Sequence, residues 1–391
     1  MSVHTGLDVL RARGLADLHG RRVGLLTNPS AVTVDLTSAY RVFTESPQVN
    51  VRALFSPEHG FAAAAADGAH VASSVDARTS LPVYSLYGSS LRPEARMLAD
   101  IDVLVCDIQD IGVRYYTFAW TISTAMEAAG AAGIDVLILD RPNPLGPAVD
   151  GDIGSNDYAS LVGLHPVPVQ HGLTLGELMR IVNARWSPTP ATLTVIPYDG
   201  YTRGDTWPGT GVPFVPPSLA MPHLSAVQQY PGACLLEGTN LSEGRGTALP
   251  FEVCGAPFID AERLADHLNA LNMPGVRYRP HVFKPAASKY AGETCSGVQA
   301  HITGLGYRPL AAWVAVIQAV RHRYPEDFAW LPPYEGSTIR PFDLLARSER
   351  VRQHIDANTP LHMLTDEWDA AAEEWRAFSD AALLIPERIS P

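Results

Sequence analysis

The first chemically informative segment of this 391-residue sequence is Pro-Glu-His-Gly at residues 57–60. It follows an apolar run at residues 49–55, and Glu58 comes too early after that run to cap a clear helix. A carboxyl group without an evident structural duty can serve as a general acid, provided that it keeps its proton near neutrality. We therefore predict that Glu58 is a catalytic acid.

One reaction that paired carboxyl groups can catalyse is hydrolysis of a glycosidic bond, in which the second group activates water or attacks the sugar carbon. The separation of the two groups decides between retention and inversion, and a 2-acetamido sugar can also supply its own amide oxygen as the nucleophile. The sequence gives no distances, so these mechanisms stay open. The candidates for the second catalytic group are Asp107, Asp110 and Glu243.

Other polar and aromatic residues accompany these carboxylates. Arginine donates paired N–H groups to a carboxylate, amides and small hydroxyls pair with sugar substituents, and aromatic rings stack on apolar faces. The structural alternatives are a salt-bridged turn for Asp140 and Arg141, a backbone hydrogen bond for His171, and a self-paired hairpin for residues 237–247. We predict that a ligand is contacted by His59, Gln109, Arg114, Tyr115, Tyr116, Asp140, Arg141, Asn143, His171, Glu237, Asn240 and Arg245.

These segments need a scaffold, and the first half of the chain alternates short apolar runs with helical patterns. Such alternation predicts an α/β fold with a doubly wound parallel sheet and helices on both faces. Ligands bind beyond the carboxyl ends of the strands in such a sheet, which is where the polar segments lie. The predicted strands are 22–27, 49–55, 102–107, 135–140, 167–170 and 193–197, and the predicted helices are 36–44, 93–99 with Pro93 as first residue, 118–129 and one opened by a capping box at 174–177.

The regular alternation ends in a Pro- and Gly-rich stretch at residues 207–231, which we interpret as an ordered loop. Beyond it, Gly-punctuated segments and two helical patterns, at 260–271 and 309–323, predict a smaller α+β domain. The predicted domains are a catalytic domain at 1–225 and a C-terminal domain at 226–391 that completes the active-site cleft.

Composition and motifs disfavour several classes of function. Neither G-x-G-x-x-G after the first strand nor a phosphate-binding G-x-x-x-x-G-K-[ST] occurs, so we expect no cofactor. The formal net charge of −12 argues against nucleic-acid and anionic-membrane partners. Four scattered cysteines without a C-x-x-C pair predict neither a disulfide framework nor a zinc site. With no long apolar run, we expect a soluble protein that is cytoplasmic as written, while export of a precursor stays open.

Several segments in chain order resemble the NamZ-type exo-β-N-acetylmuramidases. The resemblance runs from about residue 20 to residue 330, and it includes segments too long for chance agreement. The segments are SPEHGF (56–61), LPVYSLYG (81–88), DIQDIGVRYYTF (107–118), LDRPNPLG (139–146), PVQHGLTLGEL (168–178), YPGACLLEGTNLSEGRGT (230–247), PFE (250–252), SKY (288–290) and CSGVQAHIT (295–303).

The resemblance implies a Rossmann-like domain, a smaller C-terminal domain and an active site between them. It implies a glycoside hydrolase that releases N-acetylmuramic acid from the non-reducing ends of peptidoglycan fragments during cell-wall turnover and recycling. The substrate would be a small saccharide with a lactyl carboxylate, for which Arg114 is the preferred partner and Arg141 and Arg245 are reserves. Exo action predicts a pocket closed at one end, with the loop at 207–223 as its wall.

Two other classes of function stay open at this point. A metal-dependent amidase or deacetylase would need ligands such as His59, Asp107, His171 and His223, although no tight ligand spacing supports a metal site. A non-catalytic muropeptide-binding protein is the other alternative. The number of carboxylates argues against it, because an anionic ligand favours fewer acids.

Overall fold

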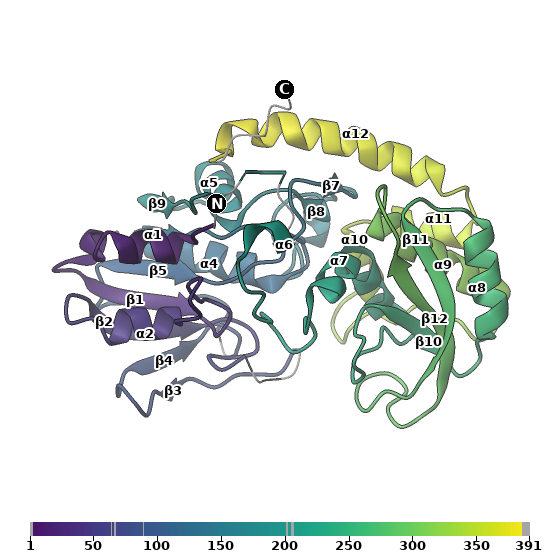
Figure 1. The fold of residues 1–391 in the computed structure, drawn as a ribbon, viewed down its shortest axis with the longest axis horizontal. Coiled ribbons are helices and arrows are strands. Elements are labelled where there is room, and N and C mark those ends of the chain that lie inside the picture. Colours follow the sequence, from purple (N-terminus) through teal and green to yellow (C-terminus); the bar gives the residue numbers. More distant parts are fainter. Residues whose placement is uncertain are drawn as a thin grey trace.

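The computed structural model describes residues 3–63, 65, 68–88, 90–200, 202–204 and 207–384. Figure 1 shows two parts side by side, one purple to teal and one mainly green. The first part is built on a seven-stranded sheet and the second on a three-stranded sheet. The yellow helix α12 (His362–Ser379) runs across the top of both parts (Figure 1).

The large sheet confirms the predicted doubly wound α/β architecture. Its strand order among the described residues is β3-β4-β2-β1-β5-β6-β9, and only the edge pair β3–β4 is antiparallel. The order reverses between β1 and β5, which makes their carboxyl ends the switch point of the sheet. The strands are β1 (Arg22–Thr27), β2 (Asn50–Ser56), β3 (Ser74–Val75), β4 (Pro82–Ser85), β5 (Val103–Asp107), β6 (Asp135–Leu139) and β9 (Leu193–Ile196).

Helices cover both faces of this sheet because successive strand residues point to opposite sides. Val23 and Leu25 of β1 belong to the buried cluster that includes helices α1 and α2, whereas Leu26 belongs to the cluster that includes α3, α4 and α5. The capping box predicted at Thr174 and Glu177 is present. The helices are α1 (Gly6–Ala12), α2 (Ala39–Thr44), α3 (Ala95–Leu98, so that Pro93 precedes it), α4 (Thr117–Ala131) and α5 (Leu175–Ile181).

The strand predicted at 167–170 is wrong as a member of the main sheet. The extended residues form β8 (Gln170–His171), which pairs antiparallel with β7 (Val149–Asp150) in a separate two-stranded sheet. The place beside β6 is taken by β9, and β8 pairs with β7 instead of adding to the outer side of β9. The short strands β3 and β4 were not predicted, since neither forms a long apolar run.

The second part contains the antiparallel strands β10 (Val253–Ala256), β11 (Val276–Phe283) and β12 (Cys295–Ile302). The helical patterns at 260–271 and 309–323 are confirmed as α8 (Ala261–Ala270) and α9 (Pro309–Arg323). The remaining helices of the whole chain are α6 (Trp207–Thr210), α7 (Leu224–Ala233), α10 (Pro341–Ala346) and α11 (Arg350–Asp356). Short helical turns in the two parts lie at Ala16–Leu18, Asn156–Tyr158, Val182–Trp186, Cys234–Gly238 and Asp380–Ala382.

The end of the described chain returns to the first part. Trp375 of α12 is buried and donates its indole N–H to the His171 carbonyl at 2.9 Å. Arg180 of α5 donates to the Ala382 carbonyl at 2.7 Å. The two parts are therefore joined through α12 and the segment that follows it. Within the described ranges, no helix is long and apolar enough to cross a membrane, and the four cysteines, all inside those ranges, are buried and free.

Candidate active site

The carboxyl ends of β1, β2, β5 and β6 lie at one edge of the large sheet, and this edge faces the C-terminal part (Figure 1). Glu58, Asp107, Asp110 and Asp140 all follow or end these strands, as the sequence predicted. Their surroundings differ, and those differences decide which of them is available for chemistry.

Glu58 lies just beyond β2 and is 8% exposed. Its Oε1 accepts the Gly68 N–H at 2.9 Å, and its Oε2 accepts the Thr117 hydroxyl at 2.7 Å. The next residue, His59, has a left-handed backbone with a φ of 68°, which is uncommon outside glycine and occurs often at functional sites. The Glu58 carboxyl is thus fixed by donors from two separate segments immediately before a sharp turn.

Asp107 and Arg141 form a sealed pair. Arg141 Nε lies 2.6 Å from Asp107 Oδ1, and Arg141 Nη2 lies 3.1 Å from Oδ2. Arg141 also donates to the Val32 carbonyl at 2.9 Å. Burial raises the pKa of Asp107, and the guanidinium opposes that rise. These contacts favour the salt-bridged structural alternative for Arg141 and leave Asp107 occupied.

Asp110 has a different environment. Its Oδ2 accepts the Gly112 N–H at 2.7 Å, whereas the buried Oδ1 has no hydrogen-bond partner among the residues the structure describes. Burial raises the pKa of Asp110 to about 7. The neighbouring Gln109 donates its amide to the Asp110 and Pro142 carbonyls at 2.7 and 3.1 Å, so Gln109 joins two strand-end loops.

Asp140 caps the start of α5 from inside the sheet edge. It accepts the Thr174 hydroxyl at 2.6 Å and the Gly176 N–H at 2.8 Å, and burial raises its pKa to about 7. These contacts favour a structural role, because both carboxyl oxygens are used to begin the helix.

Asn143 and His171 hold the loop that precedes α5. Asn143 donates to the Leu173 carbonyl at 2.9 Å and accepts the Leu145 N–H at 2.9 Å. His171 Nδ1 accepts the Leu173 N–H at 3.2 Å, and burial lowers the pKa of His171 to about 3. The backbone-bonding alternative is therefore favoured for His171.

Arg114 is completely enclosed. Its guanidinium donates to the carbonyls of Asp152, Val167 and Leu345 at 2.5, 2.8 and 2.9 Å, and its side chain has no exposed surface. Burial lowers its pKa to about 10. The geometry favours a role in joining distant backbone segments over the predicted contact with a lactyl carboxylate.

Tyr115 and Tyr116 pack against the C-terminal part. The Tyr115 hydroxyl donates to the Pro231 carbonyl, and the rings of Tyr115 and Tyr116 lie 5.8 and 6.1 Å from the ring of Tyr230. Tyr230 in turn contacts Phe251 at 4.7 Å. Thr117, whose hydroxyl donates to Glu58, directly follows Tyr116 in the chain. This series of ring contacts therefore connects the neighbourhood of Glu58 to the second part.

The second part, together with the loop that leads into it, contains a cavity of about 580 Å³. Arg245 Nη2 lies 2.7 Å from Glu237 Oε1, and the Arg245 guanidinium lies 4.9 Å from the Phe251 ring centroid. The Glu237 and Arg245 side chains are 32% and 17% exposed, in contrast to the enclosed Arg114. The cavity is lined by Leu219, Ala220, Glu237, Glu243, Arg245, Gly246, Thr247, Pro250, Ala287, Ser288, Lys289 and Tyr334.

Glu243 lines the same cavity but is held in place by Lys289. Lys289 Nζ lies 2.9 Å from Glu243 Oε2 and donates to the Leu236 and Leu241 carbonyls at 2.8 Å. Glu243 is only 1% exposed. Asn240, from the same segment, instead bonds to the backbone of Asp327 and Ala329 at 2.8 and 2.9 Å.

Sequence reasoning did not assign Lys289 and Tyr334 to the site, whereas Leu219 lies in the loop at 207–223 that was predicted as a wall. Tyr334 and Leu219 are 66% and 57% exposed and line the cavity. The SKY segment of the family resemblance pointed to Lys289. No local spacing in the sequence links Lys289 or Tyr334 to Glu243. The loop that was predicted as a wall does approach both regions, since Asn28 at the end of β1 donates to the Pro217 carbonyl at 3.2 Å.

A metal-dependent amidase or deacetylase would need a group of side chains that binds a metal ion. Across the ranges that the structure describes, no three His, Cys, Asp or Glu side chains are grouped so that they could hold a metal ion.

Comparison with known proteins gives three further findings. Two family profiles match the chain: exo-β-N-acetylmuramidase NamZ, N-terminal, over residues 23–225, and its C-terminal counterpart over residues 228–384. The peptidoglycan β-N-acetylmuramidase NamZ of Bacillus subtilis (strain 168) is 41% identical over 375 residues, covering 95% of this chain and 89% of the relative. Two crystal structures of DUF1343 family proteins from Bacteroides fragilis NCTC 9343 are similar, with TM-scores of 0.90 and 0.76 and identities of 35% and 30%; each match covers 99% of this chain and 100% of the other.

Proposed function

The chain belongs to the exo-β-N-acetylmuramidase NamZ family, and we propose that it is a glycoside hydrolase that releases N-acetylmuramic acid from the non-reducing ends of peptidoglycan fragments. The observation that carries this proposal is the 41% identity to a peptidoglycan β-N-acetylmuramidase over nearly the whole chain. The two-part fold supports it, with a carboxyl group fixed at a sheet edge that faces the second part.

Glu58 is the proposed general acid. It would donate a proton to the glycosidic oxygen as the bond to the sugar carbon breaks, so that the leaving sugar departs as an alcohol. The position of Glu58 just beyond β2, at the sheet edge, supports this role, and the Gly68 and Thr117 donors fix the orientation of its carboxyl group before substrate binds.

Asp110 is the proposed second carboxyl group. Asp107 is paired with Arg141 and Glu243 with Lys289, whereas one Asp110 oxygen lacks a partner in the described part of the chain. A general base works best when its pKa lies near the working pH, and the pKa of Asp110 is raised to about 7. Asp110 would then accept the proton of the attacking water as the new carbon–oxygen bond forms.

Arg245 is the proposed partner of the lactyl carboxylate. It is the arginine among the three candidates that lines a cavity, since Arg114 and Arg141 are enclosed by carbonyl and carboxylate oxygens. A guanidinium can bind a carboxylate through two parallel N–H groups, which suits the group that distinguishes muramic acid from glucosamine.

We also propose residues 1–225 and 226–391 as the two domains, with the wall of the exo pocket formed by residues 207–223. The contact between Asn28 and Pro217 and the position of Leu219 at the cavity support that wall. The cellular location of the enzyme stays a prediction.

Product analysis tests the proposed function. The purified full chain should release single N-acetylmuramic acid units progressively from glycan strands and should hydrolyse a chromogenic β-muramide equally with and without a chelator. Early appearance of mid-length fragments would show an endo enzyme. Loss of the activity on chelation, or release of acetate or peptide in place of sugar, would contradict glycoside hydrolysis as proposed.

A further inference from the structure

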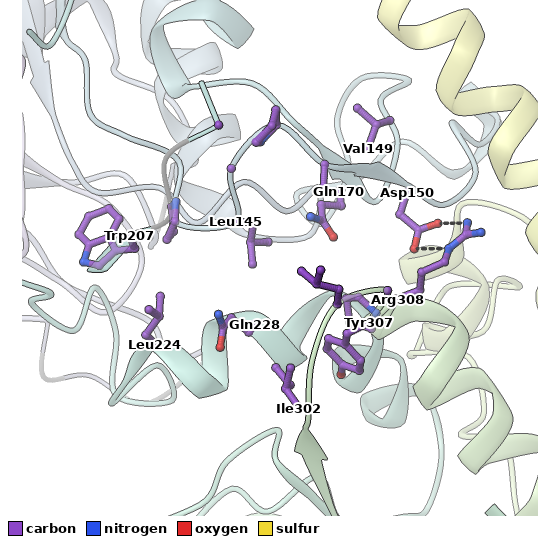
Figure 2. A pocket seen from close by; sticks show the side chains of 18 of the residues that line it. Leu145, Val149, Asp150, Gln170, Trp207, Leu224, Gln228, Ile302, Tyr307 and Arg308 are labelled. Carbon is purple, nitrogen blue, oxygen red and sulfur yellow. Dashed lines mark hydrogen bonds and ion pairs between the residues drawn. The ribbon is translucent and has the colours of Figure 1, made fainter. Parts of the chain in front are cut away.

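A second cavity of about 550 Å³ is lined by residues of both parts. Figure 2 shows it between β7 and β8 of the first part and α7 and the segment after β12 of the second. It shares no lining residue with the cavity that contains Glu237 and Arg245. None of the residues proposed for catalysis lines it.

Two glutamine side chains project into this cavity from opposite walls. Gln170 comes from β8 and Gln228 from α7 (Figure 2). Gln170 is only 5% exposed. Gln228 is half-buried, and neither side-chain amide forms a hydrogen bond to another described residue, so both are open to a ligand in the cavity. Each amide offers both a donor and an acceptor, which is the combination that a peptide bond requires.

The ends of the cavity differ in character. Leu145, Leu224 and Trp207 form an apolar end (Figure 2). Trp207 is 6% exposed, and so it offers little open ring face for stacking on a sugar.

The opposite end is charged. Arg308 Nη2 lies 2.6 Å from Asp150 Oδ1, and Arg308 Nη1 lies 3.0 Å from Asp369 Oδ1. The Asp150 side chain is 9% exposed, whereas that of Asp369 is 63% exposed. An exposed ion pair contributes little stability, so a ligand carboxylate can replace Asp369 on Arg308 at small cost.

We propose that this cavity binds a short peptide. A peptide bond would lie between Gln170 and Gln228, an aliphatic side chain at the Leu145 and Leu224 end, and a carboxylate on Arg308. A neutral sugar would use neither the charged end nor the apolar end.

Titration of the full chain with L-alanyl-D-glutamate, followed by NMR, tests the proposal directly. We expect saturable binding that is weakened about tenfold in Gln228→Leu, because the peptide bond loses one of its two amide partners. Asp369→Asn should strengthen binding about threefold, because Arg308 then loses a competing carboxylate. Glu58→Gln should leave the affinity unchanged, so the binding result does not depend on turnover.

If the dipeptide binds but no muramide is cleaved, the cavity proposal stands and the proposed function fails. Absence of dipeptide binding, equal binding by wild type and both cavity variants, or displacement of the dipeptide by N-acetylglucosamine at similar concentration would overturn the proposal.

Discussion

The charged residues of the sheet edge and those of the cavity in the second part have different surroundings. On the sheet edge, Asp107, Arg141 and Arg114 are buried; Asp107 and Arg141 bind each other, and Arg114 donates to backbone carbonyls through its Nη atoms while its Nε has no partner among the described residues. In the cavity of the second part, Glu237 and Arg245 form a pair that keeps exposed surface. The first set holds loops in place, whereas the second lines a cavity. Position at a strand end therefore does not by itself identify a functional residue.

The largest expected effect on stability comes from removing one partner of the buried Asp107–Arg141 pair. Arg141→Ala leaves the Asp107 carboxylate buried without its partner, which should lower the free energy of unfolding by about 3–5 kcal/mol. Chemical denaturation measures this loss. The matched control is Arg96→Ala, which removes an exposed pair with Glu94 and should change stability by less than about 1 kcal/mol. Similar losses of stability in both variants would contradict the distinction between the buried ion pair and the exposed one.

Asp110→Asn tests the one proposed catalytic carboxyl group on the sheet edge with an oxygen that has no hydrogen-bond partner among the described residues. Turnover should fall roughly 100-fold with the fold intact, because the proposed base is lost. The raised pKa means that Asp110 holds its proton below about pH 7 and becomes ionised above it. As a base it works only when ionised, so the wild-type rate should rise as pH increases through about 7. The variant should lack this rise; a variant that keeps the full rate and the same profile would exclude Asp110 as the base.

Arg245→Ala tests whether the arginine that lines the cavity of the second part recognises the lactyl group. Its kcat/KM ratio for muramide over glucosaminide substrates should fall about tenfold, since one charged hydrogen-bond partner of the lactyl group is removed. Because Arg245 also lies 3.6 Å from the buried Glu243, chemical denaturation should accompany the kinetics to establish that the variant is folded. Arg263→Ala, which removes an exposed surface pair with Asp260, is the control. An unchanged ratio in a folded Arg245→Ala protein would mean that the lactyl group is recognised elsewhere.

Local sequence patterns predicted most of the sheet. The strand at Arg22–Thr27 matches to the residue, because a parallel strand buried on both faces forms a continuous apolar run. The same reasoning placed β8 in the wrong sheet, because an apolar run does not reveal which edge is already occupied.

The candidate site was less predictable because its contacts join distant parts of the chain. Arg114 was expected to bind substrate, yet one of its acceptors is Leu345, 231 residues away. Lys289 holds Glu243 from 46 residues away. Ranking Asp107 below Asp110 likewise required knowing that Arg141 reaches the first carboxylate and not the second. Residue type predicted which groups gather at the sheet edge, and only the three-dimensional contacts indicate which of them remain available.

The central claim is that Glu58 supplies the acid for glycoside hydrolysis, and turnover of a chromogenic β-muramide by Glu58→Gln tests it most directly. The amide keeps the size of the side chain and can still accept a hydrogen bond, but it has no proton to donate as an acid. We expect turnover to fall by about 10²–10⁴ with unfolding unchanged, while Glu94→Gln, at an exposed surface carboxylate, stays at the wild-type rate. A folded Glu58→Gln enzyme that keeps more than about a tenth of wild-type turnover would contradict this account.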